Sequence, residues 1–359
     1  ERMGLARVVR TELRRYRVPP LHCQDWRLFP HCRSCRFRLG FAPALHPISS
    51  PRRRTVSMPN VAYMFPTFPM RDRDLESDSI PGYSDLLEQW TERAGDFVDV
   101  SGDLFAFSEP GRVEDLAATM NAHYACYLES LAMADWLGEH RSEADIVTGY
   151  SMGLFGALCY AGALDFGDGF RVMREVCTRV HEAVEGVSYA MGAVMGLEEA
   201  RVRACLDGPV EVTDVYSPST LIIAGPSEVV DTVLSDCTEA GAEETLLIPV
   251  TAPFHSTALS GVVSGNRDTV ASVTTSDPKR VVVSAIDGKP LESAADVRRE
   301  IANNVASPMS WFSTLNVLLD LGTERLYECG RSQRLTNNAR RELVGDYSVE
   351  NFLDYAAAT

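Results

Sequence analysis

The 359-residue sequence has no run of about 18 apolar residues, the length that a membrane-spanning helix needs, so we expect no transmembrane segment. The basic N-terminal stretch also lacks a continuous apolar core, and we expect no secretory signal. The nine cysteines are odd in number and scattered, which indicates reduced thiols in a cytoplasmic protein rather than a disulfide framework. With 45% hydrophobic and 23% charged residues, the composition is that of a globular protein.

Basic charge is scarce beyond residue 57. Residues 1–57 hold 13 arginines and three acidic residues, whereas the rest of the chain holds 21 basic and 47 acidic residues. A domain that binds nucleic acid needs an excess of positive charge on its surface. We therefore expect neither nucleic acid nor a membrane among the partners of this acidic body.

The arginine-rich segment 1–57 shows neither a helical nor a strand period. We interpret it as a disordered tail, or as translated sequence upstream of a natural start at Met58. An organellar transit peptide, which is rich in arginine and poor in acidic residues, is the minor alternative. The third is a metal site formed by His22, Cys23, His31, Cys32 and Cys35. A single CxxC lacks the second pair of ligands, however, and we expect no metal.

Beyond residue 57, short apolar strands alternate with helical patterns, which predicts an α/β fold with a parallel sheet. Residues 187–251 differ, because their order of strand, helix, two strands, helix and strand is that of a ferredoxin-like unit (βαββαβ). We predict a large α/β domain interrupted by a small inserted one. Its expected parts are the large domain over 58–186 and 252–345, the ferredoxin-like insert over 187–251, and a C-terminal tail over 346–359.

A G-x-S-x-G motif spans residues 149–153, between an expected strand and an expected helix, which is the setting of a nucleophile elbow. Gly149 and Gly153 supply the small residues that so tight a turn needs two positions either side of the serine. The turn exposes the hydroxyl of Ser151 at the positive end of the helix. The N–H of Met152 would then point to where an oxyanion forms. A glycine-rich turn without chemistry is the alternative.

A serine hydroxyl needs a base, and the chain has only seven histidines. Three lie within 1–57, two lie on polar helix surfaces, and His123 lies on a mostly apolar helix. His255 stands in a loop after the last strand of the insert, next to Phe254, and such loops carry catalytic residues more often than their length suggests. We therefore select Ser151 and His255 as the candidate catalytic residues.

This order of motifs resembles the malonyl-CoA:acyl-carrier-protein transacylases and the acyltransferase domains of fatty-acid and polyketide synthases. The likeness covers about residues 60–345. Further matching segments are Ala161 to Phe166, Ser217-Pro218, Ile223-Ala224-Gly225, and Asn304 to Pro308 with Trp311. The resemblance implies an α/β-hydrolase-like large domain and an acyltransferase without a bound cofactor. Its substrates and partners would be acyl-CoA and a phosphopantetheinylated acyl carrier protein. The sequence leaves the oligomeric state open, and we expect a monomer in the cytoplasm.

The resemblance also implies residue roles. Ser151 would attack the thioester while His255 takes its proton, with the backbone carbonyl of Asn304 orienting the imidazole. The oxyanion would be held by the backbone N–H groups of Met152 and Phe68. The substrate pocket would be lined by Tyr150, Ala122, His123, Phe254 and Val176.

The sequence departs from the family's pattern in the first loop and in the pocket. Phe65-Pro66-Thr67-Phe68-Pro69 lacks the family's glutamine, and Val176 stands where malonyl-specific members carry an arginine for the free carboxylate. Burying a carboxylate without such a partner is costly. Two alternatives follow: Arg179, about one turn further along the helix, binds the carboxylate, or the pocket is neutral and takes acetyl or another monoacyl group.

Three functions remain open. The leading one is transfer of an acyl group to a carrier protein; the same Ser–His dyad could instead pass the acyl group to water, as an editing thioesterase. The third is a non-catalytic docking protein of a synthase complex. A basic cluster near the C-terminus is either a docking patch for an acidic carrier or an ordinary charged helix surface; it comprises Arg331, Arg334, Arg340 and Arg341.

Overall fold

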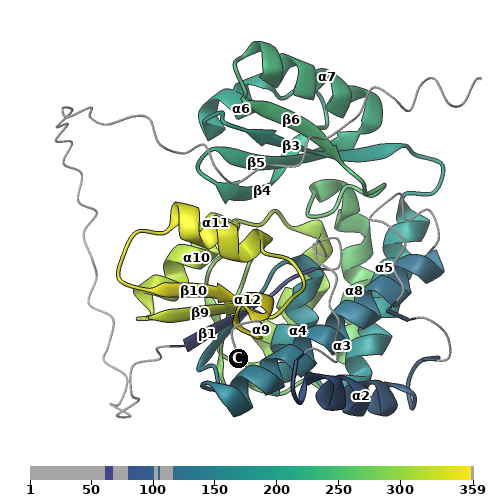
Figure 1. Ribbon diagram of the computed structural model, residues 1–359. Helices are drawn as coiled ribbons and strands as arrows, with labels where there is room; N and C mark the ends of the chain where they lie inside the picture. Colours follow the sequence, from purple (N-terminus) through teal and green to yellow (C-terminus); the bar gives the residue numbers. More distant parts are fainter. Residues whose placement is uncertain (1–60, 68–79, 101–103, 106–115, 357–359) are drawn as a thin grey trace, which may run out of the picture. The chain divides into compact units, whose positions relative to one another are not determined.

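The computed structural model describes residues 61–67, 80–100, 104–105 and 116–356 (Figure 1). The expected tail over 1–57, with its transit-peptide and metal-site alternatives, and the oxyanion donor expected at Phe68 lie outside these residues. Within the described part of the chain, no helix is both long enough and apolar enough to cross a membrane.

A six-stranded sheet forms the centre of the larger part of the fold, in the order β10-β9-β1-β2-β7-β8. Its strands from β10 to β7 are all parallel, and only β8 runs antiparallel to β7. This confirms the predicted α/β class. The strands are β1 (Val61–Phe65), β2 (Ile146–Gly149), β7 (Val281–Val283), β8 (Pro290–Leu291), β9 (Arg325–Glu328) and β10 (Ser348–Asn351).

Helices cover both faces of this sheet (Figure 1). Side chains alternate along β1, so Tyr63 and Phe65 enter one apolar cluster and Ala62 and Met64 enter another. Because both faces are covered, β1 is buried throughout and reads as a continuous apolar run. The first cluster joins α2 (Tyr83–Ala94), α3 (Leu116–His140), α4 (Leu154–Tyr160), α5 (Phe166–Ala183), α8 (Val263–Ala271), α9 (Ala294–Asn303) and α12 (Phe352–Ala356); the second joins α10 (Trp311–Asp320) and α11 (Arg334–Glu342).

A separate four-stranded antiparallel sheet is built from the chain between α5 and the return to the large sheet. Its spatial order is β4-β5-β3-β6, and α6 and α7 pack against one face through an apolar cluster of their own. The elements are β3 (Tyr189–Met195), α6 (Glu199–Cys205), β4 (Glu211–Ser217), β5 (Thr220–Pro226), α7 (Ser227–Glu239) and β6 (Glu244–Ile248).

The C-terminal residues correct one expectation. We expected 346–359 to be a tail, but Ser348–Asn351 forms β10, which pairs in parallel with β9 at the edge of the large sheet. Val349 is buried in this strand, and Phe352, which directly follows the strand, is fully buried too. The polar strand sequence Ser-Val-Glu-Asn carries no apolar run, so only its neighbours in space reveal it as part of the core.

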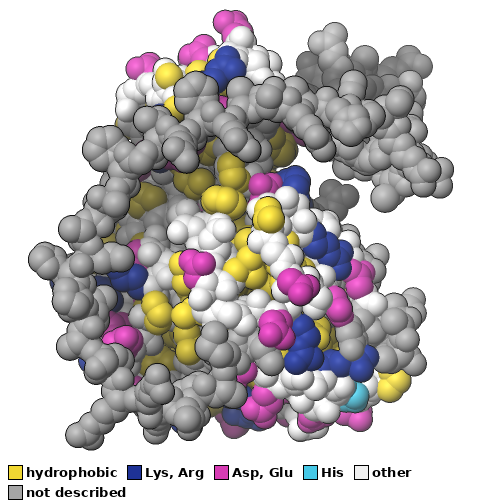
Figure 2. Space-filling model, turned by 90° about the vertical axis from the view of Figure 1, so that its left-hand side faces the viewer, with side chains coloured by type: hydrophobic (Ala, Val, Ile, Leu, Met, Phe, Trp, Pro, Cys, Tyr) yellow, Lys and Arg dark blue, Asp and Glu magenta, His cyan; other side chains and the backbone are white. Residues whose placement is uncertain are grey.

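Two of the four C-terminal arginines are held in contacts within the chain. Arg331 forms an ion pair with Glu129 on α3 at 2.5 Å, and both side chains are nearly buried. The Nε of Arg340 donates to the carbonyl of Val349 at 2.9 Å. Figure 2 shows basic and acidic side chains intermingled on the face that it presents. The contacts of Arg331 favour a structural role over docking for that residue.

The buried ion pair yields a prediction about stability. Replacing Arg331 by Met removes the guanidinium from the buried Glu129 carboxylate, and breaking such a buried ion pair costs about 3–5 kcal/mol. We expect Arg331→Met to lower the melting temperature in thermal unfolding, and the double change Glu129→Leu with Arg331→Met to recover a large part of the loss. Equal melting temperatures for the single variant and the wild type would contradict this.

Candidate active site

A strained turn after β2 presents Ser151. Its backbone φ is +55°, in the left-handed region that non-glycine residues rarely adopt. A Cβ added at Gly149 would lie 2.3 Å from the backbone N of Leu154, and one added at Gly153 would lie 2.1 Å from the carbonyl oxygen of Phe65. Both glycines are therefore needed for the turn to pass so close to β1 and α4, as the motif predicts for a nucleophile elbow.

The hydroxyl of Ser151 meets the imidazole of His255. The Oγ atom lies 2.8 Å from Nε2, although the two residues are 104 positions apart in the chain. His255 lies between β6 and α8 and also has a left-handed φ, +59°. Its backbone N–H donates to the carbonyl of Val305 at 2.7 Å, which fixes the loop against the turn that follows α9.

The carbonyl of Asn304 fixes the tautomer of His255. Nδ1 lies 2.7 Å from this oxygen, and a carbonyl can only accept, so Nδ1 carries the proton. The Nε2 lone pair is then free to accept the hydroxyl proton of Ser151. Burial lowers the pKa of His255 to about 4, against the smaller opposite effect of the carbonyls of Asn304 and Ser307. The imidazole is therefore neutral, and able to act as a base, at pH 7.

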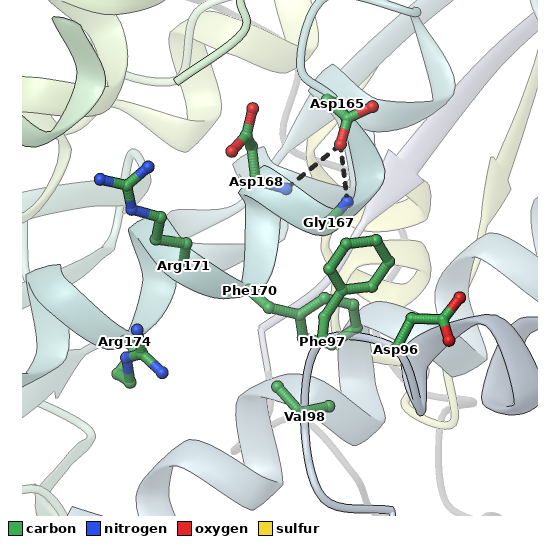
Figure 3. A pocket seen from close by; sticks show the side chains of 9 residues that line it. All are labelled: Asp96, Phe97, Val98, Asp165, Gly167, Asp168, Phe170, Arg171 and Arg174. Carbon is green, nitrogen blue, oxygen red and sulfur yellow. Dashed lines mark hydrogen bonds between the residues drawn. The ribbon is translucent and has the colours of Figure 1, made fainter. Parts of the chain in front are cut away.

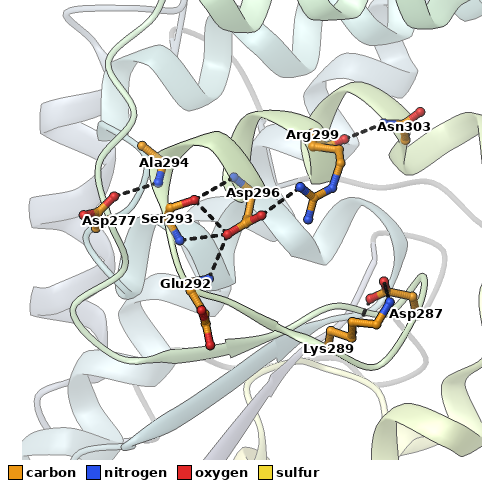
Figure 4. Close-up of polar contacts among 9 residues, drawn as sticks. All are labelled: Asp277, Asp287, Lys289, Glu292, Ser293, Ala294, Asp296, Arg299 and Asn303. Carbon is orange, nitrogen blue, oxygen red and sulfur yellow. Dashed lines mark hydrogen bonds and ion pairs between the residues drawn. The ribbon is translucent and has the colours of Figure 1, made fainter. Parts of the chain in front are cut away.

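Asn304 also contacts the serine through its side chain. Its Nδ2 donates to the backbone carbonyl of Ser151 at 3.1 Å, so one residue holds both members of the pair. Sequence reasoning named only its backbone carbonyl. The turn that contains Asn304 follows α9, whose start is fixed by a capping box between Ser293 and Asp296 (Figure 4).

The residue before the serine, expected in the substrate pocket, is embedded in the protein interior. The ring of Tyr150 packs edge-on against Tyr216 and Trp311, and its hydroxyl donates to Oδ2 of Asp214 at 2.8 Å. Its exposed fraction is 9%, within the apolar cluster of α10 and α11. The structure thus places Tyr150 in a packing contact between the elbow and the four-stranded sheet.

Two other expected pocket residues, Ala122 and His123, lie on α3, and His123 lies beside the elbow residue Met152. His123 and Met152 line a narrow cavity of about 10 Å³ with Pro66 and Thr67, too small to hold more than one water. Burial lowers the pKa of His123 to about 3, so this ring is neutral. Ala122 is also buried.

The residues expected to recognise the acyl group are apolar or already occupied. Val176 is buried in the apolar cluster of α5, and Phe254 packs against the same cluster. The guanidinium of Arg179 is bonded to Thr269 at 2.8 Å and to Glu175 at 3.3 Å. These contacts hold Arg179 between α5 and α8, and they leave it a poor candidate for binding a substrate carboxylate.

A larger cavity lies at the N-terminal end of α5, apart from the pair (Figure 3). Its volume is about 300 Å³, and Phe97, Phe170, Arg171 and Arg174 are among its lining residues. Its carboxylates are largely in use, since Asp165 caps α5 and Asp168 accepts from the N–H of Thr274. Among the described residues, no group of three or more His, Cys, Asp or Glu side chains could hold a metal ion.

Known proteins resemble this chain over most of its length, although no protein-family model matches it. It is 27% identical over 290 residues to the malonyl CoA-acyl carrier protein transacylase of Escherichia coli O157:H7, covering 79% of this chain and 93% of that protein. A solved acyl carrier protein S-malonyltransferase from Vibrio cholerae is 25% identical, with a TM-score of 0.73 over 82% of this chain and 99% of that one.

A second solved structure extends the likeness of the fold. It is described as a type II polyketide-synthase acyl-carrier protein in complex with its malonyl-transacylase. It is 24% identical, with a TM-score of 0.72 over 84% of this chain and 100% of that one, which shows a shared fold. The chain is thus similar in sequence and in fold to malonyl-CoA:acyl-carrier-protein transacylases.

Proposed function

We propose that the protein is an acyltransferase that moves an acyl group from acyl-CoA, through an ester on Ser151, to the phosphopantetheine thiol of an acyl carrier protein. The observation that carries this proposal is the 2.8 Å contact between Ser151 Oγ and a neutral, buried His255 Nε2 at a strained elbow. The names of the relatives supply the two thiol substrates, and they do not favour a hydrolase or a non-catalytic docking protein.

Each half of the reaction uses the same proton transfer. The oxygen of Ser151 attacks the thioester carbonyl while Nε2 of His255 accepts the hydroxyl proton. The tetrahedral intermediate then collapses, the C–S bond breaks, and the imidazolium returns its proton to the departing thiolate of CoA. The carrier's thiol reverses these steps: it gives its proton to His255, takes the acyl group, and Ser151 regains its hydrogen.

The oxyanion of each intermediate needs donors beside the elbow. We assign the backbone N–H of Met152, because it lies in the turn that leads into α4, where the partial positive charge of a helix start favours an anion. The N–H of Phe68 remains our candidate for the second donor.

We further propose that residues 187–251 are a ferredoxin-like insert in an α/β-hydrolase-like domain formed by 58–186 and by the chain from residue 252 onward. The support is the chain order β3-α6-β4-β5-α7-β6 and the antiparallel spatial order β4-β5-β3-β6. A cytoplasmic location remains a proposal too, supported by the free thiols of the six cysteines that the structure describes. No bound cofactor is needed for this chemistry.

The relatives and the pocket residues point to different acyl groups. The relatives named above are malonyl enzymes. In this chain, however, Val176 offers no charge, and Arg179 is bonded to Glu175 and Thr269. A carboxylate is costly to bury without a cation, so we propose a neutral pocket that takes uncharged acyl groups.

Removing the nucleophile tests the proposed function. We expect Ser151→Ala to abolish the covalent adduct that intact-protein mass spectrometry detects after mixing with acyl-CoA. Ser256→Ala is the matched control, because the hydroxyl of Ser256 donates to the carbonyl of Pro253. This variant should still form the adduct. Adding a phosphopantetheinylated carrier should move the acyl group to the carrier; release of free acid instead would favour the thioesterase.

The ionisation of His255 gives a second prediction. Because its pKa is lowered to about 4 and the base must be neutral, the rate of Ser151 acylation at low substrate concentration should rise with pH through about 4. Above that, it should stay flat between pH 6 and 8. A rate that rises with a midpoint near 6.5, the usual histidine value, would contradict a buried, neutral base.

The acyl group gives a third prediction. We expect acetyl-CoA or butyryl-CoA to acylate Ser151 at least as fast as malonyl-CoA does. The rates are measured by mass spectrometry of reactions quenched at successive times. Arg179→Ala should leave the ratio of these rates within about twofold, since its guanidinium is bonded within the protein. A strong preference for malonyl-CoA that disappears in Arg179→Ala would show instead that Arg179 binds the carboxylate.

A further inference from the structure

Strand β4 of the small sheet reaches the nucleophile side of the pair through Asp214. This carboxylate is 2% exposed, and it accepts from the hydroxyl of Tyr150 at 2.8 Å and from the backbone N–H of Trp311 at 3.0 Å. Tyr150 is the residue immediately before Ser151, and Trp311 begins α10. One side chain therefore ties the small sheet to the elbow and to the large domain at once.

The same strand reaches the base side through Glu211. Its Oε1 accepts from both the backbone N–H and the hydroxyl of Thr257, at 2.9 and 2.8 Å. Thr257 stands two residues after His255, at the start of the turn that leads into α8. Two carboxylates on one strand thus hold the chain next to each member of the pair.

The strand is itself anchored, so these two contacts have a fixed origin. The N–H of Met309 donates to the carbonyl of Thr213 at 2.8 Å, and the N–H of Val215 donates to the carbonyl of Met309 at 3.3 Å. The pairing of β4 with β5 shifts register between Val212 and Asp214. A bulge of this kind changes the direction of a side chain, which fits the turn of Asp214 toward the elbow.

Backbone strain explains why such anchoring matters. Among the described non-glycine residues, only Ser151 and His255 have φ in the left-handed region. A strained residue stays in place only when its surroundings determine its position more strongly than the strain opposes it. On the Ser151 side, the tyrosine contact adds to the Asn304 contact; on the His255 side, the threonine contact adds to the Val305 contact.

We propose that β4 is a positioning strand, in which Glu211 and Asp214 align Ser151 and His255 through Thr257 and Tyr150. This inference rests on the proposed function, because it assumes that the pair carries the reaction. Neither carboxylate takes part in chemistry: each acts through a neighbour in the chain, and their effect is on the alignment of Oγ with Nε2.

The test removes each contact with little change in shape. Tyr150→Phe keeps the ring between Tyr216 and Trp311 but loses the hydroxyl, and Glu211→Ala loses both bonds to Thr257. Glu211→Gln is the conservative variant, since a single amide oxygen can still accept both bonds. The control is Glu244→Gln, which changes an exposed acid on β6 of the same sheet.

The readout is the rate at which a fluorophosphonate probe labels Ser151, measured well below the melting temperature of every variant. We expect Tyr150→Phe and Glu211→Ala each to slow labelling roughly tenfold, because small misalignments of a reacting pair are costly. Glu211→Gln should recover most of the lost rate. With acyl-CoA, kcat should fall while KM changes little, a split that general loosening of the fold would not produce.

The double variant adds a sharper criterion. Both contacts serve one alignment, so Tyr150→Phe with Glu211→Ala should slow labelling by less than the product of the single effects. Folded variants that label as fast as the wild type and the Glu244→Gln control would overturn the positioning strand. Failure of the wild type itself to label at Ser151 would instead overturn the proposed function, and the two failures are thereby distinguished.

Discussion

The chemistry that we propose for this site depends on the hydrogen bond from His255 Nδ1 to the carbonyl of Asn304. Because a carbonyl only accepts, it fixes the proton on Nδ1 and leaves the Nε2 lone pair 2.8 Å from Ser151 Oγ. Burial keeps the ring neutral and hence basic. The geometry of the pair therefore depends on how firmly the turn after α9 and the elbow after β2 are held about one imidazole.

Both sheets help to fix the positions of these two turns. The parallel sheet brings the carboxyl end of β2 beside β1, and the glycines at 149 and 153 let the elbow pass within contact distance of Phe65. The antiparallel sheet returns the chain to the large domain just before His255. Through β4 it also contacts Tyr150 and Thr257, which lie next to Ser151 and close to His255 in the chain. The four-stranded sheet thus contacts the chain next to both members of the pair.

Local patterns predicted those parts of the fold and site whose causes are local. Glycine spacing located the elbow, and the strand-helix order over 187–251 located the second sheet. The sequence did not reveal β10, because its mostly polar residues form no apolar run and its pairing with β9 shows only in space. Nor did it reveal the hydrogen bond from the Asn304 amide to Ser151, or the one from Tyr150 to Asp214. The partners are separated by 153 and by 64 positions in the chain, and such separations leave no periodic signal.

In the proposed reaction, the carbonyl oxygen that holds the imidazole also limits which bonds can be broken efficiently. Asn304 offers a dipole where many serine hydrolases offer a full negative charge, so a protonated ring in this buried place is poorly compensated and short-lived. Expelling an amine from an amide demands a persistent acid. A thiol, with a pKa near 8.5, departs with far less assistance. Exchange between two similar thiols also ends near the free energy at which it began, so the transfer can run in either direction.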